Sequence, residues 1–386
     1  MTAAKMNISS TDTLTSAGEP KRFLLAAGGT GGHVYPAIAI AEALKNVSPD
    51  SEFLFVGTKD RMEWETVPRY GFQIKSIWIS GFHRSITIKN LLFPIKLFVS
   101  LIQSLLIIRS YKPDVVISCG GFASGPIGWV AAKSGIPLIL QEQNSYPGVT
   151  TKLLAKYASI IFTAFEHAAE YLPADKIILS GNPVRGDFEN PDLQEALDLF
   201  KFTSERSTLL VLGGSGGAKA INQAMTAHID RLHDEMGLQI IWQCGKNYVD
   251  ELLNKVNTSH YPNLRLQAYI HDMSSAYRVA DLVVTRSGAG TCSELMNLGQ
   301  PAIMVPSPNV AGDHQRKNAE SIASFHAALL IDESQLEAEL ADIVSETILN
   351  EEKLLNMQKA MLKLAKPNAA KTISKEILSF VNRIKS

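Results

Sequence analysis

The stretch Gly28-Gly29-Thr30-Gly31-Gly32-His33 decides how the first half of this chain is organised. Residues 23–27, directly before it, form a short apolar run with the length of a buried parallel strand. Residues 37–44, which follow it after Val34-Tyr35-Pro36, are typical of a helix that accepts Pro36 in its first turn. A strand, a glycine turn and a helix form an anion site, because unpaired N–H groups at the helix start face the turn. His33 adds a titratable group that a plain turn does not need.

Two common nucleotide motifs are near misses. The dinucleotide fingerprint expects a third glycine where Val34 stands and an acid after the second strand, where residues 56–58 read Val-Gly-Thr. A later glycine-rich stretch, residues 213–217, resembles a P-loop, but Ala220 follows its lysine and supplies no hydroxyl for magnesium. Either loop alone would be interpreted as a tight turn. Two of them on matching strand–turn–helix units favour ligand sites.

Length and composition bound the answer further. A chain of 386 residues suggests two or three domains. Its net charge of -1 lacks the basic excess that is typical of a nucleic-acid-binding protein. Cys119, Cys244 and Cys292 have no paired spacing, as expected of a reduced cytosolic protein. Residues 1–20 are rich in Ser, Thr and Ala without an apolar run, which predicts a disordered tail and not a signal peptide.

The order of apolar segments predicts the domain organisation. Strand–helix alternation runs through residues 21–187 and restarts over 207–366, separated by an acidic linker at 188–206, and a last helix at 367–386 is expected to pack back on the first domain. We therefore expect an α/β protein with two Rossmann-like, doubly wound domains facing a cleft. In such sheets ligands bind beyond the carboxyl ends of strands, where the loops at 28–33, 119–126 and 141–146 would converge.

One segment raises the question of a membrane. Residues 91–108, LLFPIKLFVSLIQSLLII, have the length of a spanning helix at its lower limit but contain Pro and Lys. Polar residues fall on one stripe and leave a wide apolar face, fringed by Arg84, Lys89, Lys96, Arg109 and Lys112. The pattern indicates either a helix that lies on a membrane surface without spanning it, or one buried between the sheet and its neighbours.

The second half holds a denser polar cluster. Residues 281–294 give a strand, a turn of small residues and the start of a helix, which suits a diphosphate. Glu294, one turn into that helix, is placed to accept hydrogen bonds from ribose hydroxyls. A glutamate in a first helical turn more often only complements the helix dipole. Residues 313–318, Asp-His-Gln-Arg-Lys-Asn, follow a later strand and can contact a sugar.

Across nearly its whole length the sequence resembles the MurG family of UDP-N-acetylglucosamine transferases, which convert lipid I to lipid II. The matching stretches are GGTGGHVYPAIAIAEAL, GGFASGP, QEQNS, GNPVR, GGSGGA, YIHDM, TRSGAGTCSE and DHQRKNA, in this order. The resemblance implies the GT-B glycosyltransferase architecture, with the donor nucleotide mainly on the C-terminal domain. It also implies a peripheral protein at the cytoplasmic face of the bacterial cell membrane. The partners that follow are UDP-N-acetylglucosamine, lipid I (undecaprenyl-pyrophosphoryl-muramyl peptide) and an anionic membrane surface, with no nucleic acid.

The same resemblance implies roles for individual residues. His33 corresponds to the general base. The positions for the donor are Thr30, Gly31, Gly32, Asn144, Arg185, Ser215, Ile270, Ala289, Gly290, Thr291, Cys292, Ser293, Glu294 and Gln315. The acceptor is expected at Gly121, Phe122, Ser124 and Glu142. The chain departs from the family at Gln141, where many relatives have His, and at Gly290, where a larger residue can occur.

The chemistry that this implies is displacement of UDP from an α-linked sugar by a C4 hydroxyl, with inversion. An imidazole near neutral pKa suits the base, and helix N-termini with Arg185 suit the leaving diphosphate. The sequence has no Asp-X-Asp pair, so we expect neither a metal ion nor a cofactor. His33 as a structural cap remains the alternative for that residue.

Three other functions stay open from the sequence. The first is a UDP-sugar transferase acting on a different glycolipid. The second is a UDP-N-acetylglucosamine 2-epimerase, which would need carboxylates where Thr30 and His33 stand. The third is a nucleotide-sugar-binding scaffold without catalysis, which no residue favours.

Overall fold

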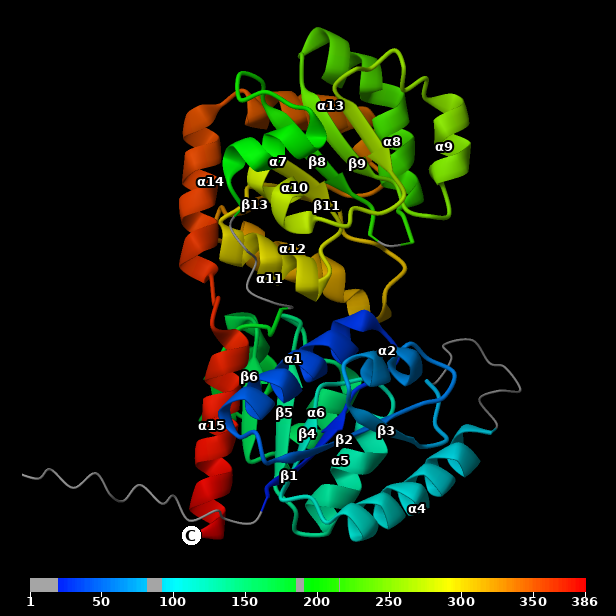
Figure 1. Ribbon diagram of the computed structural model, residues 1–386, viewed down its shortest axis with the longest axis vertical. Coiled ribbons are helices and arrows are strands. Elements are labelled where there is room, and N and C mark those ends of the chain that lie inside the picture. The colour runs from blue at the N-terminus through cyan, green and yellow to red at the C-terminus, as the bar shows by residue number, and fades with distance from the viewer. Residues whose placement is uncertain (1–19, 82–91, 185–190, 215) are drawn as a thin grey trace, which may run out of the picture.

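Two parallel β-sheets, each in its own domain, form the computed structural model, which describes residues 20–81, 92–184, 191–214 and 216–386 (Figure 1). The sheet of the N-terminal domain has the order β3-β2-β1-β4-β5-β6-β7. Its strands are β1 (Arg22–Ala26), β2 (Glu52–Gly57), β3 (Gln73–Ser76), β4 (Val115–Ser118), β5 (Leu138–Glu142), β6 (Ile160–Thr163) and β7 (Ile177–Leu179).

The sheet of the C-terminal domain repeats the same plan with the order β10-β9-β8-β11-β12-β13. Its strands are β8 (Thr208–Leu212), β9 (Gln239–Gln243), β10 (Leu264–Gln267), β11 (Leu282–Thr285), β12 (Ala302–Met304) and β13 (Ala328–Leu330). In both sheets the first strand lies centrally and the order reverses beside it, which is the doubly wound arrangement. The predicted fold class is confirmed.

Helices cover both faces of each sheet. In the N-terminal domain they are α1 (Gly31–Val47), α2 (Glu63–Arg69), α4 (Phe93–Tyr111), α5 (Ser124–Lys133) and α6 (Val149–Ala155). The C-terminal domain has α7 (Leu193–Phe200), α8 (Lys219–Asp230), α9 (Val249–Lys255), α10 (Met273–Val279), α11 (Ala289–Leu298), α12 (His314–Ala323), α13 (Leu336–Ile348) and α14 (Glu351–Leu364). The last helix is α15 (Ala369–Lys385).

The central strand β1 shows how the N-terminal domain is packed. Phe23 and Leu25 point to the core shared with α1, whereas Leu24 and Ala26 point to the core shared with α4 and α5. All four are fully buried, which explains why the strand reads as a continuous apolar run. The turn that follows β1 is therefore held between two packed layers.

α15 belongs to the core of the N-terminal domain, although it follows the whole C-terminal domain in the sequence. Its Ile373, Ile377 and Val381, spaced by four residues, are fully buried in the same cluster as the apolar side chains of α1. Figure 1 shows α14 beside the C-terminal domain and α15 continuing from it along the other domain. The chain thus crosses between the domains a second time near residues 364–369.

Part of the segment predicted as a linker is helical. α7 begins after Asp192, whose side chain accepts hydrogen bonds from the Gln194 and Glu195 amides. Its Ala196, Leu197 and Phe200 are buried in a core of the C-terminal domain.

α4 is oriented with its polar side inward. Ser100 and Ser104 are fully buried, and their hydroxyls donate to the carbonyls of Leu97 and Ser100. Several large apolar side chains face outward, with Phe98 65% exposed, whereas Ile107 and Ile108 near the end of the helix are buried. The alternative of a helix buried between the sheet and its neighbours is therefore wrong. Arg84 and Lys89 of the expected basic fringe lie outside the described residues.

Candidate active site

His33 stands at the carboxyl end of β1, in the first turn of α1. Its Nδ1 lies 3.2 Å from the carbonyl oxygen of Gly28 and 3.3 Å from the hydroxyl of Thr30. Because a carbonyl can only accept, this contact requires the ring proton on Nδ1 and leaves the lone pair on Nε2. The ring lies against Gly120, where a Cβ would come within 3.0 Å of Nε2.

The surroundings of His33 favour the neutral ring. Burial lowers its pKa from the usual value, and the positive field of His314 lowers it further. Glu142, the Gly28 carbonyl and Glu63 act in the opposite direction. A half-buried, neutral imidazole with its lone pair on Nε2 can accept a proton at neutral pH.

The second glycine turn packs directly on the first. Gly121 has φ +86°, and a Cβ there would lie 2.1 Å from the Gly28 oxygen, so no other residue fits. Phe122 is 44% exposed, and its ring lies 3.7 Å from where a Cβ of Gly29 would be. The predicted acceptor residues Gly121 and Phe122 therefore lie beside the loop that carries His33.

Two other predicted acceptor residues have their polar groups turned inward. The fully buried Ser124 hydroxyl lies 2.8 Å from the Ala26 oxygen and 2.7 Å from the Gly120 oxygen. The buried Glu142 carboxylate accepts from the amides of Asn144 and Gly148, at 3.1 Å each. The Ser124 hydroxyl and the Glu142 carboxylate are thus both engaged within the N-terminal domain, and their roles toward an acceptor stay predictions.

The loop after β5 meets α12 of the other domain. The side-chain oxygen of Asn318 accepts from the amide and hydroxyl of Ser145, and its nitrogen donates to Asn144 at 3.2 Å and to the Ser287 carbonyl at 3.2 Å. Asn318 is fully buried. One amide side chain thus links a predicted donor residue of the N-terminal domain to the nucleotide loop of the C-terminal domain.

The predicted nucleotide loop forms the open start of α11. Among the described residues, nothing lies within 4 Å of the positions that a Cβ would take on Gly288 or Gly290. Ala289, Gly290 and Thr291 present the first amides of this helix. Cys292 is fully buried and its amide donates to the Gly288 carbonyl at 2.9 Å, and the Ser293 hydroxyl donates back to the Ala289 carbonyl, so both residues are engaged within the start of α11.

Glu294 and Gln315 are held by neighbouring residues. The Tyr277 hydroxyl donates to the Glu294 carboxylate at 3.1 Å. The Gln315 side-chain oxygen accepts from the Ser307 amide at 2.9 Å, and its carbonyl accepts from the Ser287 hydroxyl at 2.8 Å.

Other predicted donor positions are spread over the same edge of the two sheets. Ile270 is buried, and its amide donates to the side chain of Gln243 at 2.9 Å. Thr30, Gly31 and Gly32 occupy the start of α1. Arg185 and Ser215 lie outside the described residues.

Sequence reasoning missed Tyr277 and Gln243 as members of the site, and it placed Asn318 in the sugar-contacting stretch 313–318 without foreseeing its contacts with Asn144 and Ser145. Asn318 lies within DHQRKNA, one of the matching stretches, so its position gave a signal. Tyr277 and Gln243 gave none, because each reaches the site from an element that carries no motif.

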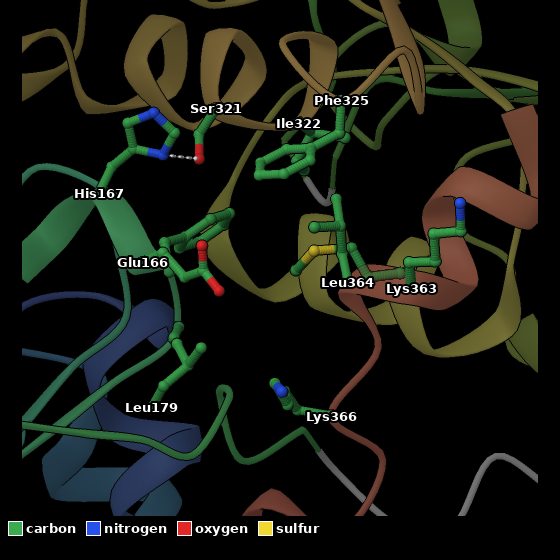
Figure 2. Close-up of a pocket in the computed structure, with 12 residues that line it drawn as sticks. Glu166, His167, Leu179, Ser321, Ile322, Phe325, Lys363, Leu364 and Lys366 are labelled. Carbon is green, nitrogen blue, oxygen red and sulfur yellow. Dashed lines mark hydrogen bonds between the residues drawn. The ribbon is translucent and has the colours of Figure 1, made fainter.

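A separate pocket lies where the domains meet near α14. Figure 2 shows its lining, from Glu166 and His167 of the N-terminal domain to Ser321, Phe325 and Lys363 of the C-terminal one. His167 Nδ1 and the Ser321 hydroxyl are 2.9 Å apart across the interface. Among the described residues, none of the predicted site residues lines this pocket, so it is distinct from the site at His33. No group of three or more potential metal ligands occurs in the described ranges.

Comparisons with known proteins show the family of this chain. Residues 23–163 match the glycosyltransferase family 28 N-terminal domain, and residues 208–373 match the glycosyltransferase family 28 C-terminal domain. A protein of Flavobacterium psychrophilum named UDP-N-acetylglucosamine–N-acetylmuramyl-(pentapeptide) pyrophosphoryl-undecaprenol N-acetylglucosamine transferase is 47% identical over 95% of this chain and 100% of its own length. A protein of Christiangramia forsetii with the same name is 44% identical over 94% of this chain and 99% of its own length.

Solved structures give the same result. The crystal structure of Acinetobacter baumannii MurG is 29% identical, has a TM-score of 0.76 and covers 93% of this chain and 100% of that one. The Staphylococcus aureus MnaA–UDP structure, 18% identical with a TM-score of 0.66, covers 95% of this chain and 98% of that one and shares the fold alone.

Proposed function

We propose that this chain makes lipid II. It belongs to glycosyltransferase family 28 and, within that family, to the UDP-N-acetylglucosamine–N-acetylmuramyl-(pentapeptide) pyrophosphoryl-undecaprenol N-acetylglucosamine transferases. It transfers N-acetylglucosamine from UDP-N-acetylglucosamine to the C4 hydroxyl of the muramyl sugar of lipid I and releases UDP. The observation that carries this proposal is the 47% identity over 95% of the chain. The pairing of a neutral imidazole on one domain with an open helix start on the other supports it.

His33 performs the proton transfer. Nε2 accepts the proton of the C4 hydroxyl while its oxygen forms a bond to C1 of N-acetylglucosamine. The bond from C1 to the diphosphate oxygen breaks with its electrons, so UDP leaves and the configuration at C1 inverts. The lone pair on Nε2 and the lowered pKa of His33 make the neutral base available at pH 7.

The start of α11 stabilises the departing UDP. Amides at a helix N-terminus point at an anion and cost no reorganisation as charge develops. Gly288 and Gly290 leave room for a diphosphate to approach the backbone. Glu294, oriented by Tyr277, accepts hydrogen bonds from the ribose, and Gln315 contacts the sugar.

Acceptor-dependent release of UDP tests the proposal. Purified enzyme with UDP-N-acetylglucosamine and a short-chain muramyl lipid should release UDP, and omission of the muramyl lipid should abolish release. Release with a diacylglycerol acceptor instead would indicate a different glycolipid. Conversion of the donor alone to its 2-epimer would replace the proposal with the epimerase.

The exposed apolar face of α4 supports peripheral membrane binding. α4 is long and apolar enough to span a membrane by length and composition, but a helix packed on its own domain through buried Ser100, Ser104, Ile107 and Ile108 is not free to do so. The outward apolar residues are Leu92, directly before α4, and Ile95, Leu97, Phe98, Ile102 and Leu106 within it. Phe93, in contrast, is partly buried against the core. We propose that this face enters an anionic cytoplasmic leaflet while Lys96, Arg109 and Lys112 contact its head groups.

Matched leucine substitutions test this surface. Leu106 on α4 is 60% exposed and Leu349 on the other domain is 63% exposed. Leu106→Ser combined with Phe98→Ser should weaken co-sedimentation with anionic vesicles and lower turnover on a long-chain acceptor. Leu349→Ser should change neither, and all variants should retain turnover on a short-chain acceptor. Wild-type enzyme that stays in the supernatant at low salt would refute peripheral binding.

A further inference from the structure

Glu63 is a buried carboxylate that lies beneath the loop carrying His33. It is the first residue of α2, and only 1% of it is exposed. One of its carboxylate oxygens accepts from the Gly29 amide at 3.0 Å. The other accepts from the amide and the hydroxyl of Thr58, at 3.0 and 2.9 Å. Glu63 therefore ties together the carboxyl ends of β1 and β2.

The Gly29 amide and the Gly28 carbonyl belong to one peptide group, and this connects Glu63 to the imidazole. The N–H of that group donates to Glu63, while its oxygen accepts from Nδ1 of His33 at 3.2 Å. The result is a continuous chain of hydrogen bonds that runs from the carboxylate through the peptide to the ring. In such a chain each bond polarises the next and strengthens it by about 10–30%.

Two glycines make room for this arrangement. A Cβ on Gly28 would lie 2.7 Å from Oε1 of Glu63, and a Cβ on Gly57 would lie 2.5 Å from its Cγ. The carboxylate packs directly against both turns, so its place is fixed by backbone on two sides.

We infer that Glu63 is a positioning residue for His33, acting through the peptide group between Gly28 and Gly29. The carboxylate draws the peptide N–H and enriches its oxygen in negative charge. That oxygen then holds the Nδ1 proton, keeps the lone pair on Nε2, and stabilises the imidazolium that forms when the ring accepts a proton. The catalytic consequence rests on the proposed function, but the effect on the ring itself does not.

The occupied Gly29 amide also assigns a role to the first glycine turn. An amide that already donates to Glu63 does not donate to a diphosphate. The anion bound at the Gly29 amide is therefore the Glu63 carboxylate of the protein itself. The turn serves to fix the orientation of the His33 imidazole. Gly31 and Gly32, at the start of α1, are left for the donor.

Three titratable side chains face His33 from different elements. Glu142 of β5 and Glu63 of α2 favour its charged form, and His314 of α12 disfavours it. The carboxylate of Glu142 is engaged with the amides of Asn144 and Gly148, whereas that of Glu63 is joined to His33 through a shared peptide. Loss of Glu63 should therefore change both the pKa of His33 and the position of its proton.

The test is an NMR titration of side-chain ¹⁵N-labelled histidine in the full-length wild type and in Glu63→Gln, with His33 assigned from His33→Asn. The wild-type ring should be protonated on Nδ1. In Glu63→Gln the amide cannot accept from both Gly29 and Thr58, so the pKa of His33 should fall by roughly half a unit or more and the proton should be shared between the two nitrogens. An unchanged pKa and tautomer would overturn the inference.

Asp114→Asn is a matched control. The Asp114 carboxylate accepts from the Arg22 amide at 2.8 Å, at the opposite end of β1, so the same chemical change is made at the same strand. It should leave the titration of His33 unaltered. If Glu63→Gln does not fold, Glu63→Asp keeps the charge but shortens its reach, and its His33 should titrate below the wild type. A wild-type titration in Glu63→Asp would refute a connection through the peptide.

Turnover gives a second readout in an enzyme shown to release UDP. Glu63→Gln should lower kcat roughly 10- to 100-fold, the loss that is typical when the hydrogen-bond partner of a metal-bound histidine is removed, with the KM for the donor little changed. The rise of kcat/KM with pH should move to lower pH. In a His33→Ala background the same substitution should have no further effect on kcat. Absence of acceptor-dependent UDP release in the wild type would refute the proposed function and leave the NMR result to decide the role of Glu63.

Discussion

The turns after β1 and β11 are both strand–turn–helix units, yet their interiors differ. The turn after β1 is filled from within, by Glu63 on the Gly29 amide and by Gly121 against the Gly28 oxygen. The turn after β11 is empty around Gly288 and Gly290 among the described residues. The same strand–turn–helix unit can therefore either orient a side chain of the protein or bind a ligand. Which of the two it does depends on residues far away in the sequence.

The largest expected effect separates the chemistry of the filled turn from binding at the open one. His33→Ala should lower kcat by about 10²–10⁴-fold, because a general base contributes that much. Binding of UDP, measured by calorimetry, should be unchanged, since the base lies on the other domain. Wild-type turnover in this variant would make His33 a structural cap.

Glu294→Ala should instead weaken the binding of UDP and leave the proton transfer at His33 intact. Loss of a hydrogen bond to a charged group costs about 1.5–3 kcal/mol, so UDP should bind roughly 10- to 150-fold more weakly. The pH dependence of the reaction should stay as in the wild type. Calorimetry that finds undiminished UDP affinity would show that Glu294 only complements the helix dipole.

Matched glycine substitutions compare the interiors of the turns directly. Gly121→Ala places a Cβ 2.1 Å from a carbonyl oxygen at φ +86°, and the strained backbone alone costs about 1–3 kcal/mol. Its free energy of unfolding should fall by at least that much in urea titrations. Gly290→Ala meets no atom within 4 Å and should unfold like the wild type, while it binds UDP more weakly. Equal stability of the two variants would contradict the comparison.

The smallest effect is on the pH profile. The pKa of His33 is lowered below its usual value of about 6.5, chiefly by burial. The base works only when unprotonated, so kcat/KM should rise with pH through a midpoint below about 6.5 and be level at neutral pH. Initial rates from pH 5 to 8 measure it. A midpoint above 7 would mean that the carboxylates outweigh burial.

The fold could be predicted because its signals are local. Apolar runs and glycine turns recur in the order that a doubly wound sheet requires, and both sheets follow it. The helix at Leu193–Phe200 was missed although Asp192 caps it and Ala196, Leu197 and Phe200 share one face. Pro191 and the acidic residues around it favoured the prediction of a linker over that of a helix.

The site could be predicted only in part, because burial and direction are not local. The motif containing Ser124 pointed to the acceptor, but the hydroxyl turns into the sheet. The sequence predicts a polar stripe on α4, but nothing in it shows that Ser100 and Ser104 face inward. Glu63 carries no motif, and its role appears only when two strand ends are seen side by side.

The place of α15 sets the order in which the two domains can be completed during synthesis. Ile373, Ile377 and Val381 fill the core of the N-terminal domain, but they are translated only after the whole C-terminal domain. Ribosomes add about 5–20 residues per second, so this domain waits on the order of ten seconds or more, while the whole C-terminal domain is made, with part of its core uncovered. The nascent first domain should therefore be the one that chaperones bind, and the one lost when the chain stops early.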